Sequence, residues 1–310
     1  MQRGHFGSLV RNGVEHICDQ ERTDKTAVYR QTPESFWRSR GNPPEPNIMT
    51  PSRLAKSRPK FTPTDIDGNE IHNEILLRVP PNEREPLFSK LEFVRLKTHH
   101  VLHEARRSIR SVYFVNSGLA SVVSVLTDGR SVEVGLIGKE GFVGLALLAG
   151  FRKSFTRVIA QADMAAFRLD ADVLTGLLRN SPVLNRELQR LLQIATVEMS
   201  QLAACNRLHQ VNQRLARWLL MSQDRISSKS LPLTHEFLAL MLGTRRSSVS
   251  LAAGVLQDAG VINYSRGNVV ILSRPALERA ACECYQLIRQ HIEEETGAGL
   301  KLRYLSSRES

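Results

Sequence analysis

The stretch that decides the fold is residues 234–261, THEFLALMLGTRRSSVSLAAGVLQDAGV. It has the pattern of two short helices joined by a tight turn at Gly243, where glycine accepts a positive φ at the least cost. This pattern predicts a helix-turn-helix, a motif that lays its second helix in a DNA major groove. We expect Ala239 to let the two helices approach closely, and the apolar inner face to consist of Leu238, Leu242, Val249 and Ala252.

The outer face of the second helix begins with short or cationic hydrogen-bonding side chains, which suit contacts with phosphates and base edges. Two apolar runs, 261–264 and 269–272, follow around a turn that contains glycine, and they predict a β-hairpin, or wing. An isolated helical hairpin is the simpler alternative, but helix, turn and wing together favour a winged helix-turn-helix. The predicted DNA contacts are Thr234, Thr244, Arg245, Arg246, Ser247, Ser248, Ser250 and, at the tip of the wing, Arg266.

The chain has 310 residues, a net charge of +11 and a hydrophobic fraction of 42%. This length predicts about two domains, and the basic excess favours a polyanionic partner such as double-stranded DNA. The sequence contains neither an apolar run of membrane-spanning length nor the apolar core of a signal peptide. We therefore expect a soluble cytoplasmic protein with no membrane partner. The four cysteines, Cys18, Cys205, Cys282 and Cys284, are too sparse for a disulfide framework.

Five parts are expected along the chain. Residues 1–68 are rich in Pro, Ser, Arg and Asn and predict a disordered extension; a DNA-contacting arm and a start at Met49 are the alternatives. A train of short β-type runs, with Asp128-Gly129 as a hairpin signal, predicts a β-roll. The fold class is thus α+β. The predicted boundaries are 1–68 for the extension, 69–182 for the β-roll, 183–224 for a long helix, 225–290 for the winged helix-turn-helix and 291–310 for a flexible tail.

The long helix carries apolar residues at alternating steps of four and three, which is the spacing of a coiled-coil seam. Packing on the chain's own domain is the alternative to a homodimer. The seam fails at Asn206 and His209, where a second stripe of Leu208, Val211, Leu215, Trp218 and Leu219 takes over. This switch indicates two packing partners in series, a second chain and then the DNA-binding domain. The predicted dimer contacts are Leu188, Leu192, Ala195, Met199 and Leu202.

A β-roll, a long helix and a winged helix-turn-helix in this order resemble the Crp/Fnr family of bacterial transcription regulators. The resemblance covers about residues 70–290, and its specific parts are GKEGFVG (138–144), the long helix and residues 233–272. It implies a cyclic-nucleotide-binding-like β-roll, a homodimer on a palindromic promoter site and RNA polymerase as a further partner. It implies a regulator and not an enzyme, so no catalytic residues are expected.

The resemblance also sets expectations for the effector. In the family's cyclic-AMP receptor, a Glu after the Phe-x-Gly turn holds the ribose, and a later Arg-Ser pair holds the phosphate. Here Leu145 follows Gly144, and the later stretch reads KSFT (153–156). The unpaired polar groups of a bound nucleotide would cost several kcal/mol, so cyclic-nucleotide binding is not expected. The predicted effector pocket contains Gly141, Gly144, Leu145 and Arg157.

No metal or other cofactor is expected from the cysteines. The Fnr branch holds an iron–sulfur cluster near its N-terminus, but only Cys18 lies in the first 200 residues here. Cys282 and Cys284 are expected in a C-terminal helix, where positions two apart point to different faces. Plain packing is therefore favoured over a metal or redox role, while haem sensing stays open because one His suffices.

The recognition helix has Arg246-Ser247 and Leu251 where the cyclic-AMP receptor has an Arg-Glu pair and a second Arg, so the operator should differ. Arg246 retains the means to contact a guanine.

The rival hypotheses are a small-molecule sensor without DNA binding and a cupin-like metal protein. The latter would use His99, His100, His103 and Glu104, whose spacing does not match cupin ligands.

Overall fold

A computed structural model of the chain describes residues 64, 65, 67–226 and 228–296. Most of the predicted extension, with Met49, and residues 297–310 of the predicted tail lie outside the described residues. The first helices are α3 (Glu74–Arg78) and α4 (Pro81–Phe88). Asn73 begins α3 by accepting a hydrogen bond from the backbone N–H of Leu76. None of the helices in these ranges is long and apolar enough to cross a bilayer.

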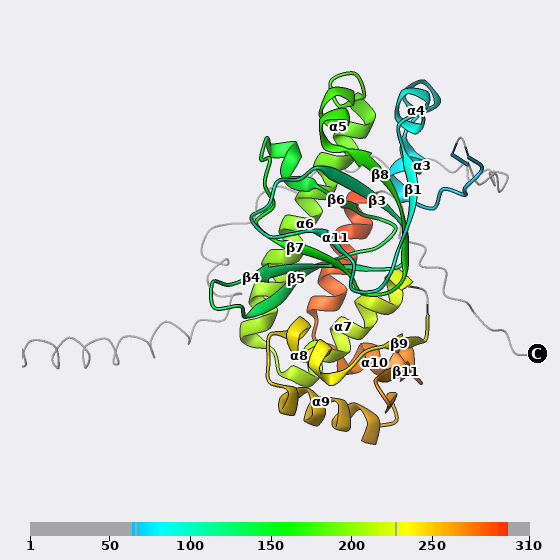
Figure 1. The fold of residues 1–310 in the computed structure, drawn as a ribbon. Coiled ribbons are helices and arrows are strands. Elements are labelled where there is room, and N and C mark those ends of the chain that lie inside the picture. Colours follow the sequence, from blue (N-terminus) through cyan, green and yellow to red (C-terminus); the bar gives the residue numbers. More distant parts are fainter. Residues whose placement is uncertain (1–63, 66, 227, 297–310) are drawn as a thin grey trace, which may run out of the picture. The chain divides into compact units, whose positions relative to one another are not determined.

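Two four-stranded antiparallel sheets form the predicted β-roll (Figure 1). The first has the order β1-β8-β3-β6 and the second β2-β7-β4-β5. Buried aromatic side chains of β3, β6 and β8, among them Phe114, Phe142 and Phe167, fill its core. The strands are β1 (Glu92–Leu96), β2 (Val101–His103), β3 (Ser111–Ser117), β4 (Ala120–Val125), β5 (Ser131–Ile137), β6 (Phe142–Val143), β7 (Arg157–Ala160) and β8 (Met164–Asp170).

The expected continuous helix is interrupted. A short 3-10 helix, η2 (Leu145–Ala149), and α5 (Ala171–Leu177) precede α6 (Pro182–Leu208), which ends before α7 (Val211–Ile226) begins. His209 between them has an extended backbone, with φ −108° and ψ 150°. The side chain of Gln213 accepts a hydrogen bond from the N–H of Gln210 at 3.1 Å, which caps the new helix. The prediction of one helix was therefore wrong, because the chain changes direction where its apolar stripe changes partner.

The predicted dimer seam is only partly open. Leu188 and Leu202 are buried within the chain itself, so they cannot face a second copy, and their assignment to a dimer interface was wrong. Leu192 and Ala195 are half-buried, and the side chain of Met199 is 40% exposed. The open part of the seam thus consists of Leu192, Ala195 and Met199. Leu208 of the predicted second stripe is 68% exposed and takes no part in the core.

The winged helix-turn-helix is formed as predicted. Its helices are α8 (His235–Leu242) and α9 (Arg246–Asp258), and its wing is β10 (Ile262–Ser265) with β11 (Asn268–Ile271). A third strand, β9 (Ser230–Pro232), pairs with β11. It was not predicted, because three residues that end in proline are too few to show the alternation of apolar and polar side chains typical of a strand. Two further helices close the domain, α10 (Arg274–Ala280) and α11 (Cys284–Thr296). Residues 291–296 are therefore helical, and the prediction of a flexible tail was wrong for them.

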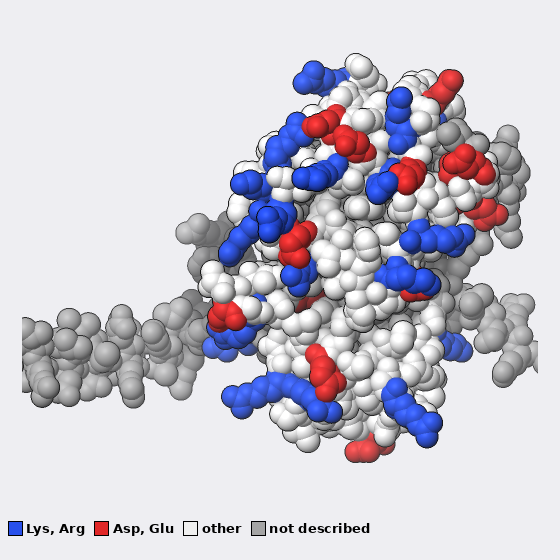
Figure 2. Space-filling view, viewed as in Figure 1, with Lys and Arg blue, Asp and Glu red and all other residues white. Residues whose placement is uncertain are grey.

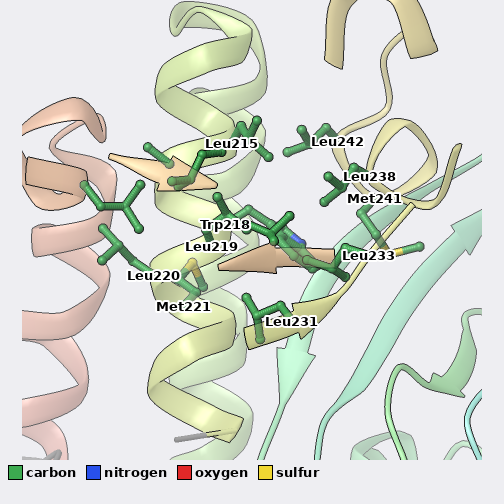
Figure 3. Close-up of a cluster of buried hydrophobic side chains, with 14 of the residues drawn as sticks. Leu215, Trp218, Leu219, Leu220, Met221, Leu231, Leu233, Leu238, Met241 and Leu242 are labelled. Carbon is green, nitrogen blue, oxygen red and sulfur yellow. The ribbon is translucent and has the colours of Figure 1, made fainter. Parts of the chain in front are cut away.

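One hydrophobic cluster joins α7, α8 and α9 to the β-roll (Figure 3). Trp218 of α7 lies in its centre, with Leu233, Leu238 and Met241 nearby. Val123 and Leu136 of the β-roll belong to the same cluster. The burial of Leu215, Trp218 and Leu219 in this cluster confirms that this part of the second stripe packs on the DNA-binding domain.

Candidate DNA interface and effector cavity

The first helix of the helix-turn-helix, α8, is fixed at both ends. Thr234 caps α8 by accepting a hydrogen bond from the N–H of Phe237 at 3.1 Å. Gly243 ends α8 with φ +59°, and a Cβ at this position would lie 2.7 Å from Cγ2 of Val132 on β5. Both the backbone conformation and this close approach require glycine.

The first turns of α9 present the predicted polar side chains on the surface. Arg245, Arg246, Ser247 and Ser250 are exposed, whereas Thr244 and Ser248 are half-buried. The predicted inner residues Leu238, Leu242, Val249 and Ala252 are buried, which holds this polar face outward.

Two apolar side chains continue the outer face of α9. The side chain of Leu251 is 74% exposed and that of Val255 is 54% exposed. Apolar groups in a recognition helix can contact the methyl group of thymine. Val255 was not singled out from the sequence, although it lies one helical turn after Leu251 on the same face.

Arg246 is engaged in an ion pair. Its Nε lies 2.8 Å from Oε1 of Glu236 on α8, and both side chains are mostly exposed. An exposed pair of this kind contributes at most about 1 kcal/mol, so a phosphate or a guanine edge can displace the carboxylate. The sequence shows few acids near this face, and Glu236 was not identified from it as a competitor for Arg246.

The wing is held against the helix-turn-helix. Arg266 and Gly267 have φ +48° and +75°, which gives the two-residue turn that matches the twist of a hairpin. Tyr264 of β10 stacks on His235 with ring centroids 4.2 Å apart. His235 Nδ1 in turn lies 3.0 Å from the hydroxyl of Ser250 on α9. Wing and recognition helix therefore form one surface.

Lys and Arg side chains are scattered over the face of the molecule in Figure 2, with Asp and Glu between them. They do not gather into one continuous basic patch on this face. The sequence likewise distributes its basic excess along the whole chain. The charges on this face therefore do not by themselves mark a contact surface for a polyanion.

A cavity of about 320 Å³ lies between the β-roll and α6. The predicted Gly141, Gly144 and Leu145 line it. Gly144 has φ +133°, and a Cβ there would lie 2.6 Å from Cγ1 of Val112, so the turn after β6 requires glycine. Arg157 does not line the cavity, because its guanidinium binds Glu104 at 2.9 Å on a half-exposed surface. Its assignment to the effector pocket was wrong.

Each arginine that lines the cavity is paired with a carboxylate. Arg78 and Arg190 both bind Glu187, at 3.2 and 3.1 Å. Arg225 Nε lies 2.7 Å from Oε1 of Glu140, and its Nη2 lies 3.5 Å from Oε1 of Glu198. The cations of the cavity are therefore neutralised internally by buried or half-buried acids.

A buried carboxylate joins the β-roll to α7. Glu133 of β5 accepts hydrogen bonds from Trp218 Nε1 at 2.7 Å, from the Ser121 hydroxyl at 2.7 Å and from Gln161 Nε2 at 2.8 Å. Burial raises the pKa of Glu133 to about 7, although these hydrogen bonds oppose the shift. This group was not identified from the sequence. In the sequence, Glu133 is visible only as an acidic residue within an otherwise apolar strand pattern.

The histidine cluster of the cupin hypothesis does not converge. Within the described part of the chain, His99, His100, His103 and Glu104 do not form a group of candidate metal ligands. His103 is instead buried on β2, with Nε2 2.7 Å from the carbonyl oxygen of Ser111. Burial lowers the pKa of His103, which favours the neutral ring.

The C-terminal cysteines lie together, contrary to expectation. Cys282 precedes α11 in a turn, and Cys284 begins the helix, so the two thiols are not constrained to opposite helix faces. Both are buried beside Cys205 of α6. A hydrogen bond from Cys282 lowers the pKa of Cys205. The prediction that Cys282 and Cys284 point apart was wrong, because Cys282 lies outside the helix.

Comparison with known proteins identifies the class of each domain. A model of the cyclic nucleotide-binding domain matches residues 93–181, and a model of the Crp-like helix-turn-helix domain matches residues 213–280. The chain therefore belongs to the Crp/Fnr family. No curated protein matches the chain in a sequence search.

Solved structures share the arrangement of domains. One is a protein from Eubacterium rectale described as a regulator of the Crp/Fnr family, with a TM-score of 0.56 and 19% identity; the match covers 67% of this chain and 98% of that one. The c-di-GMP-responsive regulator CLP of Xanthomonas campestris has a TM-score of 0.54 and 17% identity, over 63% and 100%. FixK2 from Bradyrhizobium japonicum has a TM-score of 0.54 and 16% identity, over 62% and 98%. At these identities the likeness establishes the fold alone, with a β-roll followed by a long helix and a helix-turn-helix.

Proposed function

We propose that the chain is a sequence-specific transcription regulator that binds a palindromic promoter site as a homodimer in the cytoplasm. The observation that carries the proposal is the outward polar face of α9, with Arg245, Arg246, Ser247 and Ser250 exposed. Arg266 at the tip of the wing is exposed as well and is placed to bind a phosphate. RNA polymerase is the proposed further partner at the promoter, and no catalytic role is proposed.

The dimer is proposed on the open part of the seam. Leu192, Ala195 and Met199 leave apolar surface uncovered on α6, and the same three residues border the cavity. A second copy packed on this seam would cover that surface and bring two recognition helices to two half-sites. Because the seam borders the cavity, a ligand in the cavity would contact the region through which the two copies meet.

Arg246→Ala should weaken specific DNA binding by about 1–3 kcal/mol and relax the preference at one base pair of each half-site. The operator is first obtained by sequencing genomic fragments that the protein retains, and affinities are then measured by fluorescence anisotropy at fixed salt. Glu236→Gln is the matched control, because it frees Arg246 from its carboxylate partner and should preserve or strengthen binding. An unchanged affinity and footprint for Arg246→Ala would contradict the proposed base contact.

Cyclic AMP and cyclic GMP should not stabilise the protein. The paired arginines of the cavity leave no free cation for the cyclic phosphate among the residues that line it, and Leu145 replaces the ribose acceptor. A ligand that binds only the folded state raises the melting temperature in a concentration-dependent way. We expect no saturable rise in a thermal-shift titration with either nucleotide, and a clear saturable rise would refute this part of the proposal.

A small-molecule sensor without DNA binding is the second candidate, because no residue of α8, α9 or the wing lines the cavity. The two functions are separated by the salt dependence of binding to duplex DNA. A DNA-binding regulator loses affinity steeply as salt rises, since phosphate contacts release counterions. A sensor alone would show no retention of duplex at low salt.

A further inference from the structure

We propose that Cys205, His209, Cys282 and Cys284 form a tetrahedral site for one Zn²⁺ ion that fastens the C-terminal helix α11 to the end of α6. The site is separate from both the DNA-contacting face and the β-roll cavity described above. It joins two segments more than seventy residues apart in the sequence, since Cys205 and Cys282 differ by 77 positions.

The four side chains bring their ligand atoms close enough together to share a single ion. One ligand atom from each residue lies within 4.8 Å of all the others. The Sγ atoms of Cys205 and Cys282 are 3.4 Å apart, and Cys284 Sγ lies 3.5 Å from His209 Nδ1. Zinc with Zn–S bonds of about 2.3 Å and Zn–N bonds of about 2.0 Å separates its tetrahedral ligands by roughly 3.5–3.8 Å. Three cysteines and one histidine are also a ligand set of structural zinc sites.

The groups around the ligands orient them for a metal. His209 turns Nδ1 toward the cysteines, while its Nε2 lies 3.2 Å from a carboxylate oxygen of Glu283. A carboxylate that holds the second ring nitrogen of a histidine fixes the tautomer that leaves the first nitrogen free for a metal. Gln201 donates a hydrogen bond from Nε2 to Cys284 Sγ at 3.1 Å. Such a donor stabilises a thiolate.

Burial and charge also fit a closed site. The three cysteines are buried, and the side chain of His209 is only 16% exposed. The buried guanidinium groups of Arg214 and Arg217 on α7 interact electrostatically with Cys205. Three thiolates around one Zn²⁺ ion carry a net charge of −1, which these cations would balance.

A disulfide or an iron–sulfur cluster would account for less of this arrangement than a single ion does. A disulfide between Cys205 and Cys282 would leave Cys284 and the oriented His209 without a role. An iron–sulfur cluster binds its ligands through separate iron atoms, so its cysteine sulfurs lie farther apart than a set that converges on one point. The convergence of all four ligand atoms favours one tetrahedral ion.

The location gives the ion a structural consequence. His209 is the residue at the break between α6 and α7, and Cys205 lies on the last turn of α6. Cys282 and Cys284 bring in the segment between α10 and α11. The ion would therefore fix the bend through which the β-roll is connected to the helix-turn-helix. Because metal binding to the folded chain adds to its stability, removal of the ion should lower the melting temperature.

The test uses the full chain, reduced and stripped with a chelator, and titrated with Zn²⁺ against a chromogenic competitor. We expect one equivalent of tightly bound Zn²⁺ and a rise in melting temperature. Replacement by Co²⁺ should give the intense visible absorption of tetrahedral cobalt together with thiolate charge-transfer bands. Cys282→Ser and Cys284→Ser should lose tight binding and the cobalt spectrum, whereas Cys18→Ser, the matched control, should keep both.

Glu283→Gln tests the site without removing a ligand or a core side chain. It should lower the Zn²⁺ affinity by about 10-fold, because His209 loses its carboxylate partner. Glu294→Gln, an exposed carboxylate on α11, should leave the affinity unchanged. Absence of a stoichiometric Zn²⁺ ion and of the cobalt spectrum in the folded, reduced protein would overturn the proposal. Stoichiometric iron with acid-labile sulfide, or unchanged Zn²⁺ binding in both serine variants, would overturn it as well.

Discussion

Replacing both Leu192 and Met199 by glutamate should convert the protein to a monomer and reduce its affinity for the palindromic operator by about 100-fold or more. These side chains are the open, apolar part of the seam on α6. Four unpaired carboxylates would enter the interface of the dimer, and each costs several kcal/mol when desolvated without a partner. A monomer can engage only one half-site at a time. Sedimentation velocity measures the first effect and fluorescence anisotropy at matched salt the second.

Gln193→Glu is the matched control for the seam. Gln193 is exposed and follows Leu192 directly, but a step of one residue places it on another side of the helix. It should leave both the dimer and the DNA affinity unchanged. A double variant that sediments as a dimer of unchanged stability would show that the copies do not meet through this face. Loss of DNA binding without loss of the dimer would instead assign these residues to the cavity that they border.

Glu133→Gln should abolish a pH-dependent loss of stability of about 3 kcal/mol. Burial raises the pKa of Glu133 to about 7, from an ordinary value of 4.5 in the unfolded chain. Between these values the folded protein holds a proton that the unfolded chain has released. The contribution of Glu133 is therefore fully present below the unfolded pKa and is lost as the pH rises through 7. Glutamine stays neutral throughout and can still accept the hydrogen bond of Trp218.

The measurement is urea unfolding of both proteins at several pH values from about 5 to about 8. We subtract the free energy of unfolding of the native protein from that of the glutamine variant. This difference should increase by about 2–3 kcal/mol as the pH rises across this range, because the native protein loses stability and the variant does not. Glu294→Gln, an exposed position, should show a flat difference. A flat difference for Glu133→Gln would mean that this carboxylate is already ionised in the folded protein at low pH.

The local patterns of the sequence were sufficient for the fold class and for the polar outer face of α9. Two helices around Gly243 and a wing around Gly267 are short-range features, and the structure confirms each of them. The polar side chains from Arg245 to Ser250 could be placed on the outer face because the apolar residues between them must be buried. Most strands of the β-roll were also found, since alternation and turn residues act over a few positions. The short strands β2 and β6 were not predicted, because two or three residues carry too little alternation.

The interruption at His209 was visible in the sequence only as a change of apolar stripe. The periodicity located the change correctly, but it did not show whether the helix bends there or ends. A helix end depends on caps and on partners from other segments, here the side chain of Gln213 and the groups around His209. The same limit applies to Leu188 and Leu202, whose spacing fits a seam although their own chain buries them.

The sequence by itself determined the class of each domain, because helix and strand periodicity and turn chemistry are properties of neighbouring residues. Only the tertiary structure decided which distant side chains meet. It pairs Arg157 with Glu104 outside the cavity, buries Glu133 against Trp218 and brings Cys205 and His209 to Cys282 and Cys284. Such encounters depend on how the packed elements are oriented in space, and the spacing of residues along the chain does not record that orientation.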